Sequence, residues 1–122
     1  MKIRQADFFA YLVSDLKTSA AFYRDVLGLP QTEYREDWQW AEFDCGNITL
    51  TLYGGSELPE IALGGRIALA VDDIQAAHRT LQERAAQIVR GPFELSGCWH
   101  LEILDPDRNL IILHQRKDGT AA

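Results

Sequence analysis

The residues of this chain with the clearest chemical potential are His100 and Glu102, which lie two positions apart in an alternating apolar stretch. Residues two apart in a β-strand share one face of the sheet, so we expect the imidazole and the carboxylate side by side. An imidazole titrates near neutral pH, and a nearby carboxylate raises the pKa of an imidazole. The pair therefore suits proton transfer or hydrogen bonding to a ligand, and mutual pairing inside the protein is the alternative.

Two tryptophans form a second group with binding chemistry. Trp38 and Trp40 alternate with Gln39 and Ala41, so we expect both indoles on one face of a strand. Aromatic rings in such a position bind flat or cationic organic molecules. Packing in a core or against a second subunit is the alternative.

Composition excludes several function classes. The 122 residues carry a formal charge of -6 at pH 7, which argues against nonspecific binding to nucleic acids. No apolar run approaches the ~20 residues that cross a bilayer, and the first residues lack a secretory signal. Cys45 and Cys98 lack metal-type spacing and are expected to be free thiols. We expect a cytoplasmic protein with no membrane partner.

Hydrophobic periodicity predicts the elements that position these residues. In the first half we expect a strand over 8–13, a helix that Asp15 caps and Gly28 ends, and strands over 31–36, 38–44 and 48–53. In the second half we expect a strand over 66–71, a helix from Asp73 to about residue 85, and strands over 87–90, 98–104 and 109–115. The order β-α-β-β-β therefore occurs twice.

The two halves resemble each other. Residues 13–16 match residues 71–74 in character and in position before a helix, as in an internal duplication. We predict a single domain over 1–122, with module 1 at about 1–55, a linker at 56–65 and module 2 at about 66–116.

Three motifs link the chain to a known family: the helix stretch 15–29, the strand 65–72 and the turn Asp105-Pro106-Asp107. In this order the chain resembles the vicinal oxygen chelate superfamily of glyoxalases, bleomycin resistance proteins and dioxygenases. The resemblance implies an α+β fold in which two tandem βαβββ modules form a curved, half-barrel-like mixed sheet with helices on the outer face. It also implies a ligand cavity and, as in many short members, a homodimer.

The same resemblance places four metal-ligand positions, which fall on Phe8, on Thr49 or Thr51, on Arg66 and on Ile112. Divalent metals need carboxylate, imidazole or thiolate donors, which phenyl, alkyl and guanidinium groups do not supply. We therefore expect no metal and no cofactor at the usual place. The metal-dependent lyase and dioxygenase activities of the family are not expected here.

The resemblance also implies an apolar cup with four polar groups, Arg66, His100, Glu102 and His114. Glu102 would contact a ligand, neutralise Arg66, or take part in proton transfer with His100. A displaced metal on His100, Glu102 and His114, or one with an unusual donor such as Cys98, stays open.

We predict a small-molecule-binding protein without the family's metal ligands, which binds an aromatic or cationic organic ligand in an apolar cup. The predicted ligand-binding residues are Phe8, Trp38, Trp40, Thr49, Thr51, Arg66, His100, Glu102, Ile112 and His114. One alternative is a metal-independent lyase or isomerase of the same fold that uses His100, Glu102 and Arg66 on an anionic substrate. Another is an interaction module whose tryptophans only bury a dimer interface.

Overall fold

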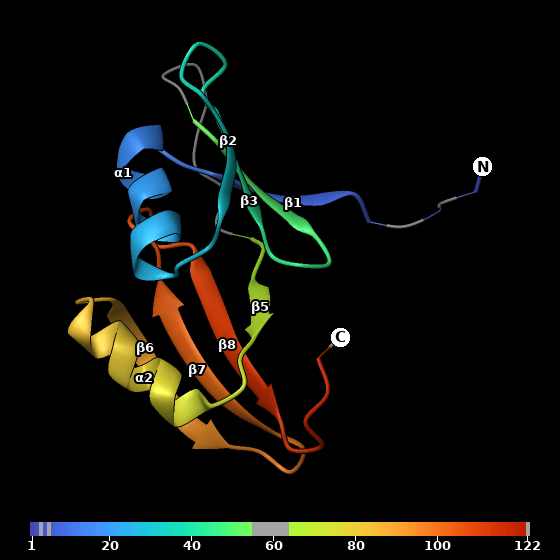
Figure 1. The fold of residues 1–122 in the computed structure, drawn as a ribbon, viewed down its shortest axis with the longest axis vertical. Helices are drawn as coiled ribbons and strands as arrows, with labels where there is room; N and C mark the ends of the chain where they lie inside the picture. The colour runs from blue at the N-terminus through green and yellow to red at the C-terminus, as the bar shows by residue number, and fades with distance from the viewer. Residues whose placement is uncertain (3, 5, 55–63, 122) are drawn as a thin grey trace. The chain divides into compact units, whose positions relative to one another are not determined.

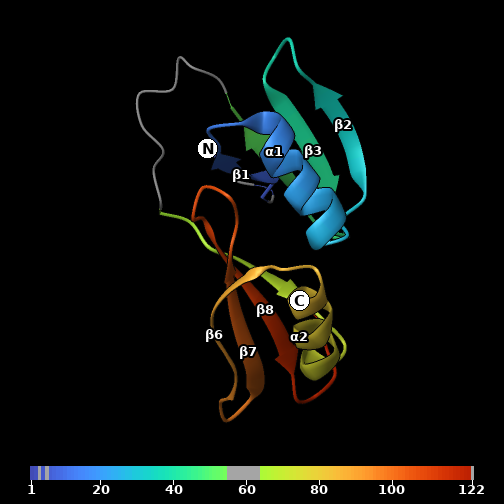
Figure 2. The ribbon, with the colours of Figure 1, turned by 90° about the vertical axis from the view of Figure 1, so that its left-hand side faces the viewer.

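The computed structural model describes residues 1–2, 4, 6–54 and 64–121. Contacts divide the chain into two compact units, unit 1 at Met1–Ala62 and unit 2 at Leu63–Ala122. Each unit contains one four-stranded sheet with one helix packed against it (Figures 1 and 2). Of the predicted linker 56–65, residues 56–63 lie outside the described part of the chain.

Unit 1 contains β1 (Phe8–Leu12), α1 (Leu16–Ala21) continued by a π-helical turn (Phe22–Val26), β2 (Gln31–Arg35), β3 (Trp40–Asp44) and β4 (Thr49–Tyr53). The strand order is β1-β4-β3-β2, with β1 parallel to β4 and the other pairs antiparallel. The Asp15 carboxylate accepts the backbone N–H of Thr18 at 3.0 Å, which caps the helix. Gly28, at a φ of 74°, follows the helical segment as predicted.

Unit 2 repeats this plan with β5 (Ile67–Ala70), α2 (Ile74–Glu83), β6 (Gln87–Glu94), β7 (Cys98–Leu104) and β8 (Leu110–Arg116). The order β5-β8-β7-β6 corresponds strand for strand to that of unit 1, and β5 is parallel to β8. Asp73 caps α2 through the backbone N–H groups of Gln75 and Ala76. The predicted α+β fold of two βαβββ modules is confirmed.

The core of each unit lies between its sheet and its helix. In unit 1 the fully buried rings of Tyr23 and Phe43 lie 5.8 Å apart, and Tyr11 lies 6.3 Å from Tyr23. In unit 2 the buried side chains are aliphatic, with Leu101 and Ile111 among them. No helix in the described part of the chain has the length and apolar character to cross a membrane.

Strand β6 continues beyond its predicted end at residue 90, and it contains a bulge. Arg90 pairs with Glu102 and Phe93 pairs with His100, so three steps along β6 match two steps along β7. Gly91 lies in this bulge at a φ of 96°, and a Cβ atom there would lie 2.7 Å from the carbonyl oxygen of His100. The close approach and the left-handed backbone both require glycine.

Candidate functional site

The side of the unit 1 sheet opposite α1 carries three aromatic rings, Phe8, Trp40 and Tyr53, which we call the aromatic face. Trp40 lies edge-to-face with both neighbours, at 6.0 Å between ring centroids in each case. Phe8 is 53% exposed and Tyr53 is 41% exposed, which is unusual for large apolar side chains. Exposed apolar clusters of this kind mark sites where a ligand or a partner binds.

Polar groups border the aromatic face. The indole Nε1–H of Trp40 donates a hydrogen bond of 2.9 Å to Oε1 of Glu42. Strand register brings Thr51 beside Glu42 and Thr49 beside Phe8, so both threonines belong to the same side of the sheet. The Thr51 hydroxyl is buried and donates to the carbonyl oxygen of Phe9. Glu42 is therefore an acidic group in direct contact with one of the rings.

Trp38 does not share a strand face with Trp40, so this part of the prediction is wrong. Strand β3 begins only at Trp40, and Gln39 before it has a φ of 52°, which breaks the alternation. Trp38 lies in the preceding turn, is 62% exposed and carries the Arg35 guanidinium 3.9 Å above its ring.

The side of the unit 2 sheet opposite α2 carries Arg90, His100 and Glu102, which we call the charged face. Arg90 donates to both carboxylate oxygens of Glu102, from Nε at 2.9 Å and from Nη2 at 3.0 Å. His100 Nε2 lies 3.1 Å from Oε1 of the same carboxylate. The Arg90 guanidinium, and to a smaller degree His100, hold the pKa of the Glu102 carboxyl below its ordinary value, although burial opposes this.

The arrangement orients the imidazole of His100. An ionised carboxylate only accepts hydrogen bonds, so the proton of a neutral His100 belongs on Nε2, and Nδ1 keeps its lone pair. Among the described residues, Nδ1 has no hydrogen-bond partner. The ring lies 4.9 Å from that of Phe93 and edge-to-face with His114 at 6.3 Å. Such an imidazole has the chemistry to accept a hydrogen bond or a proton from a bound molecule.

Arg66 is not the partner of Glu102, so the alternative in which Glu102 neutralises Arg66 is wrong. Arg90 occupies the position directly across from Glu102 on the neighbouring strand, so its guanidinium forms the ion pair with the carboxylate. Arg66 instead precedes β5 and lines a small cavity of unit 2. Ile112 lies beside Glu102 on β8, and Cys98 is a half-buried free thiol at the start of β7.

The residues at the expected metal positions do not fit a metal ion. Phe8 pairs with Thr49 in unit 1, and Ile112 pairs with Ala68 in unit 2, so neither pair offers a carboxylate, imidazole or thiolate. Within residues 1–2, 4, 6–54 and 64–121, no three His, Cys, Asp or Glu side chains form a group that could hold an ion, and this covers His100, Glu102 and His114.

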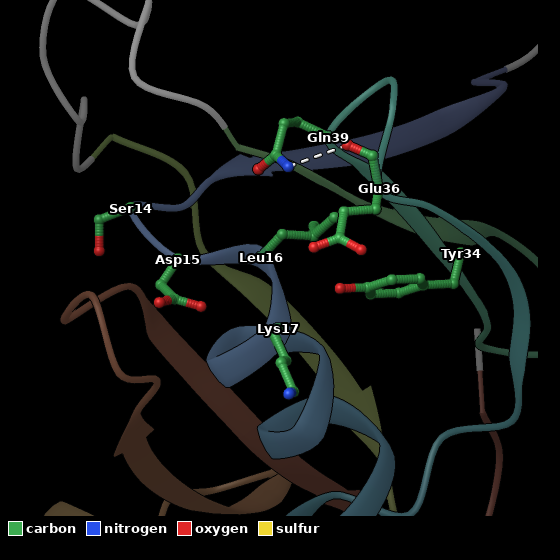
Figure 3. A pocket seen from close by; sticks show the side chains of 7 residues that line it. All are labelled: Ser14, Asp15, Leu16, Lys17, Tyr34, Glu36 and Gln39. Atoms are coloured by element: carbon green, nitrogen blue, oxygen red, sulfur yellow. Dashed lines mark hydrogen bonds between the residues drawn. The ribbon is translucent and has the colours of Figure 1, made fainter.

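A polar groove in unit 1 was not predicted. Its cavity of about 500 Å³ lies between the start of α1 and the end of β2 and is lined by Ser14, Asp15, Leu16, Lys17, Tyr34, Glu36 and Gln39 (Figure 3). A second cavity of about 390 Å³ shares Lys17, Tyr34 and Glu36 with it. The lining residues come from separate elements without a common motif, so sequence reasoning had no signal for the groove.

Arg90 was missed as the partner of Glu102 because the pairing depends on strand register, and Phe93 was missed because the expected strand ended at residue 90. The available signal was Gly91-Pro92 within a β pattern, which is typical of a bulge in an edge strand.

Comparison with known proteins places this geometry in a family. The model of the Glyoxalase/Bleomycin resistance protein/Dioxygenase superfamily matches residues 5–113 of the chain. The Bacillus subtilis protein YraH, described as uncharacterized, is 28% identical over 119 residues, which cover 85% of this chain and 92% of that protein.

Solved structures share the fold over nearly the whole chain. TnmS3, an antibiotic binding protein from Streptomyces sp. CB03234, is 25% identical with a TM-score of 0.79, over 96% of this chain and 99% of that one. Lactoylglutathione lyase from Agrobacterium tumefaciens is 22% identical with a TM-score of 0.77, over 93% of this chain and 95% of that one.

Proposed function

The chain belongs to the Glyoxalase/Bleomycin resistance protein/Dioxygenase superfamily, and we propose that it is a small-molecule-binding member that holds an aromatic or cationic organic ligand. The observation that carries this proposal is the exposed aromatic face of Phe8, Trp40 and Tyr53. A flat ligand on these rings would remove apolar surface from water and stack on the indole.

Charge supports a preference for cations. Glu42 lies beside Trp40, and the chain as a whole carries a formal charge of -6. A cation over an indole interacts with the electron-rich ring face, and a neighbouring carboxylate adds to the attraction. The similar protein TnmS3 is described as antibiotic binding, which supports binding of an organic molecule as a role for this fold.

The donor set supports binding over the metal-dependent reactions of the family. Phenyl, hydroxyl, guanidinium and alkyl groups stand at the positions Phe8, Thr49 or Thr51, Arg66 and Ile112, so this chain lacks the donors that a divalent ion needs there.

Trp40→Ala and Trp38→Ala form a matched pair for the test. Each protein is titrated with a panel of cationic aromatic dyes and with uncharged analogues, and the dissociation constant is measured by tryptophan fluorescence and thermal shift. Loss of the indole on the aromatic face should weaken binding about ten-fold. Loss of the Trp38 indole, which lies in the turn, should change the dissociation constant less than two-fold. The proposal fails if no compound binds, or if both variants weaken binding equally.

The hydrogen bond between His100 and Glu102 favours a second candidate function, a metal-independent lyase or isomerase. Proton abstraction by Nδ1 of His100 from a carbon next to a carbonyl group would exchange that hydrogen with solvent. Incubation with small ketoacids in heavy water, followed by proton NMR, tests this function. His100→Gln should abolish any exchange, and the candidate is excluded if the native protein exchanges no hydrogen.

The proposal also includes a homodimer located in the cytoplasm. Light scattering coupled to size exclusion measures the oligomeric state, and fractionation of the expressing cell measures the location.

A further inference from the structure

A small cavity at one end of the unit 2 sheet contains two arginines. Its volume is about 220 Å³, and its lining consists of Gly64, Gly65, Arg66, Leu104, Arg108, Asn109 and Leu110. We propose that this cavity is an anion site in which Arg66 and Arg108 bind a phosphate group. The proposal stands independently of ligand binding at the aromatic face, because it uses other residues.

Strand topology brings the two arginines to one place. Strand β8 lies between β5 and β7, with Ile67 beside Ile111 and Leu104 beside Leu110. The start of β5, the end of β7 and the start of β8 therefore meet at one end of the sheet, where the β7–β8 loop lies beside the segment that enters β5 (Figure 2). Arg66 comes from that segment and Arg108 from that loop.

The β7–β8 loop holds Arg108 on a well-bonded turn. The buried carboxylate of Asp105 accepts the backbone N–H of Asp107 at 2.9 Å and that of Asn109 at 2.7 Å. It also accepts Nδ2 of Asn109 at 2.9 Å. Three donors thus engage the Asp105 carboxylate, which reduces its competition for the guanidinium groups.

Arg108 occupies a backbone conformation that favours glycine or asparagine, with a φ of 70°. The same conformation occurs at Gln39 and Ala85, so it assigns no role to the Arg108 side chain, but it makes glycine a substitution that the backbone accepts.

The two arginines of the cavity differ from the three arginines that form ion pairs. Arg24, Arg35 and Arg90 each contact a carboxylate at 2.8–2.9 Å. Among the described residues, neither Arg66 nor Arg108 has a carboxylate within the 4.0 Å limit of an ion pair. Two guanidinium groups that line one cavity repel each other, and a dianion between them would turn this repulsion into attraction.

Phosphate fits this site better than a larger ligand. A guanidinium group donates two parallel hydrogen bonds to a phosphate, and two such groups balance a dianion. The cavity is smaller than the ~300–1,000 Å³ of drug-sized sites, so it suits a phosphate group rather than a whole organic molecule.

The test is a titration of the ¹⁵N-labelled full chain with inorganic phosphate and with methyl phosphate, at constant ionic strength adjusted with NaCl. NMR signals of the Arg66 and Arg108 side chains should shift and saturate. Tighter binding of methyl phosphate would identify the phosphate group of an organic molecule as the ligand, and tighter binding of inorganic phosphate would identify the free ion.

Matched variants complete the test. Arg66→Gln and Arg108→Gln should each raise the dissociation constant at least ten-fold, because each removes a charged donor. Arg108→Gly should do the same without a loss of thermal stability, since glycine suits the backbone there. Arg79→Gln, which removes a charge from an exposed position of α2, should change binding less than two-fold. Shifts that fail to saturate, or variants that bind like the native protein, overturn the proposal.

Discussion

The aromatic face and the charged face occupy equivalent sides of two sheets with the same strand order, yet their chemistry is opposite. The aromatic face presents three rings and a carboxylate hydrogen-bonded to one of them, whereas the charged face presents an arginine, a glutamate and a histidine joined by hydrogen bonds. The sides that pack against α1 and α2 are both apolar and buried. The repeated fold thus constrains the helix side, and leaves the other side free to carry different chemistry.

Strand β3 allows the first and largest test, because it presents Phe43 to the helix side and Trp40 to the aromatic face. Phe43→Ala should lower the free energy of unfolding by about 3–5 kcal/mol, since it leaves a cavity beside Tyr23. Trp40→Ala should cost about 1 kcal/mol, because its ring is already partly exposed. Urea denaturation followed by circular dichroism measures both, and equal losses would contradict the division between the two sides.

Gly91 allows a test of the charged face without any change to its charged groups. Gly91→Ala should cost about 1–3 kcal/mol, because the added methyl group meets the His100 carbonyl and the backbone is left-handed. Gly97→Ala, at an open position, should stay within about 0.5 kcal/mol of the native protein. Thermal melts of the two variants compare the positions, and equal stability would show that the bulge tolerates a side chain.

Glu102→Gln should produce a small effect on stability and the most pH-dependent one. The folded protein holds the pKa of Glu102 below its ordinary value, so the ionised carboxylate stabilises the fold at neutral pH, and this contribution fades as pH falls below about 4.3. We expect a loss of about 1 kcal/mol at pH 7, limited by the exposure of Arg90.

Melts of Glu102→Gln, of the native protein and of the exposed control Glu83→Gln, from pH 7 to pH 3, measure this dependence. The difference between Glu102→Gln and the native protein should shrink on acidification, and a constant difference would argue against an ionised Glu102.

Local patterns were sufficient to predict most of the fold. Asp15 and Asp73 signalled the helix starts, Gly28 signalled a helix end, and alternation located the strands because each sheet has one apolar side. The error at Trp38 came from the left-handed backbone conformation at Gln39. Because residue 39 is not a glycine, the sequence pattern did not indicate this conformation.

Site geometry was less predictable than the fold. Alternation assigned Glu102 to a side of the sheet but not to a partner, because the partner depends on strand register and on the bulge at Gly91. The ligand-binding roles of His100, Glu102, Arg66 and the other predicted residues stay predictions until binding is measured.

The three-against-two match between β6 and β7 makes the charged face adjustable by chain length as well as by residue type. Because β6 lies at the edge of its sheet, a deletion or insertion in the bulge would disturb no other strand pair. One residue more or less would bring a different set of β6 side chains opposite His100 and Glu102. The bulge is therefore a position at which the insertion or deletion of a single residue would give this fold a new specificity.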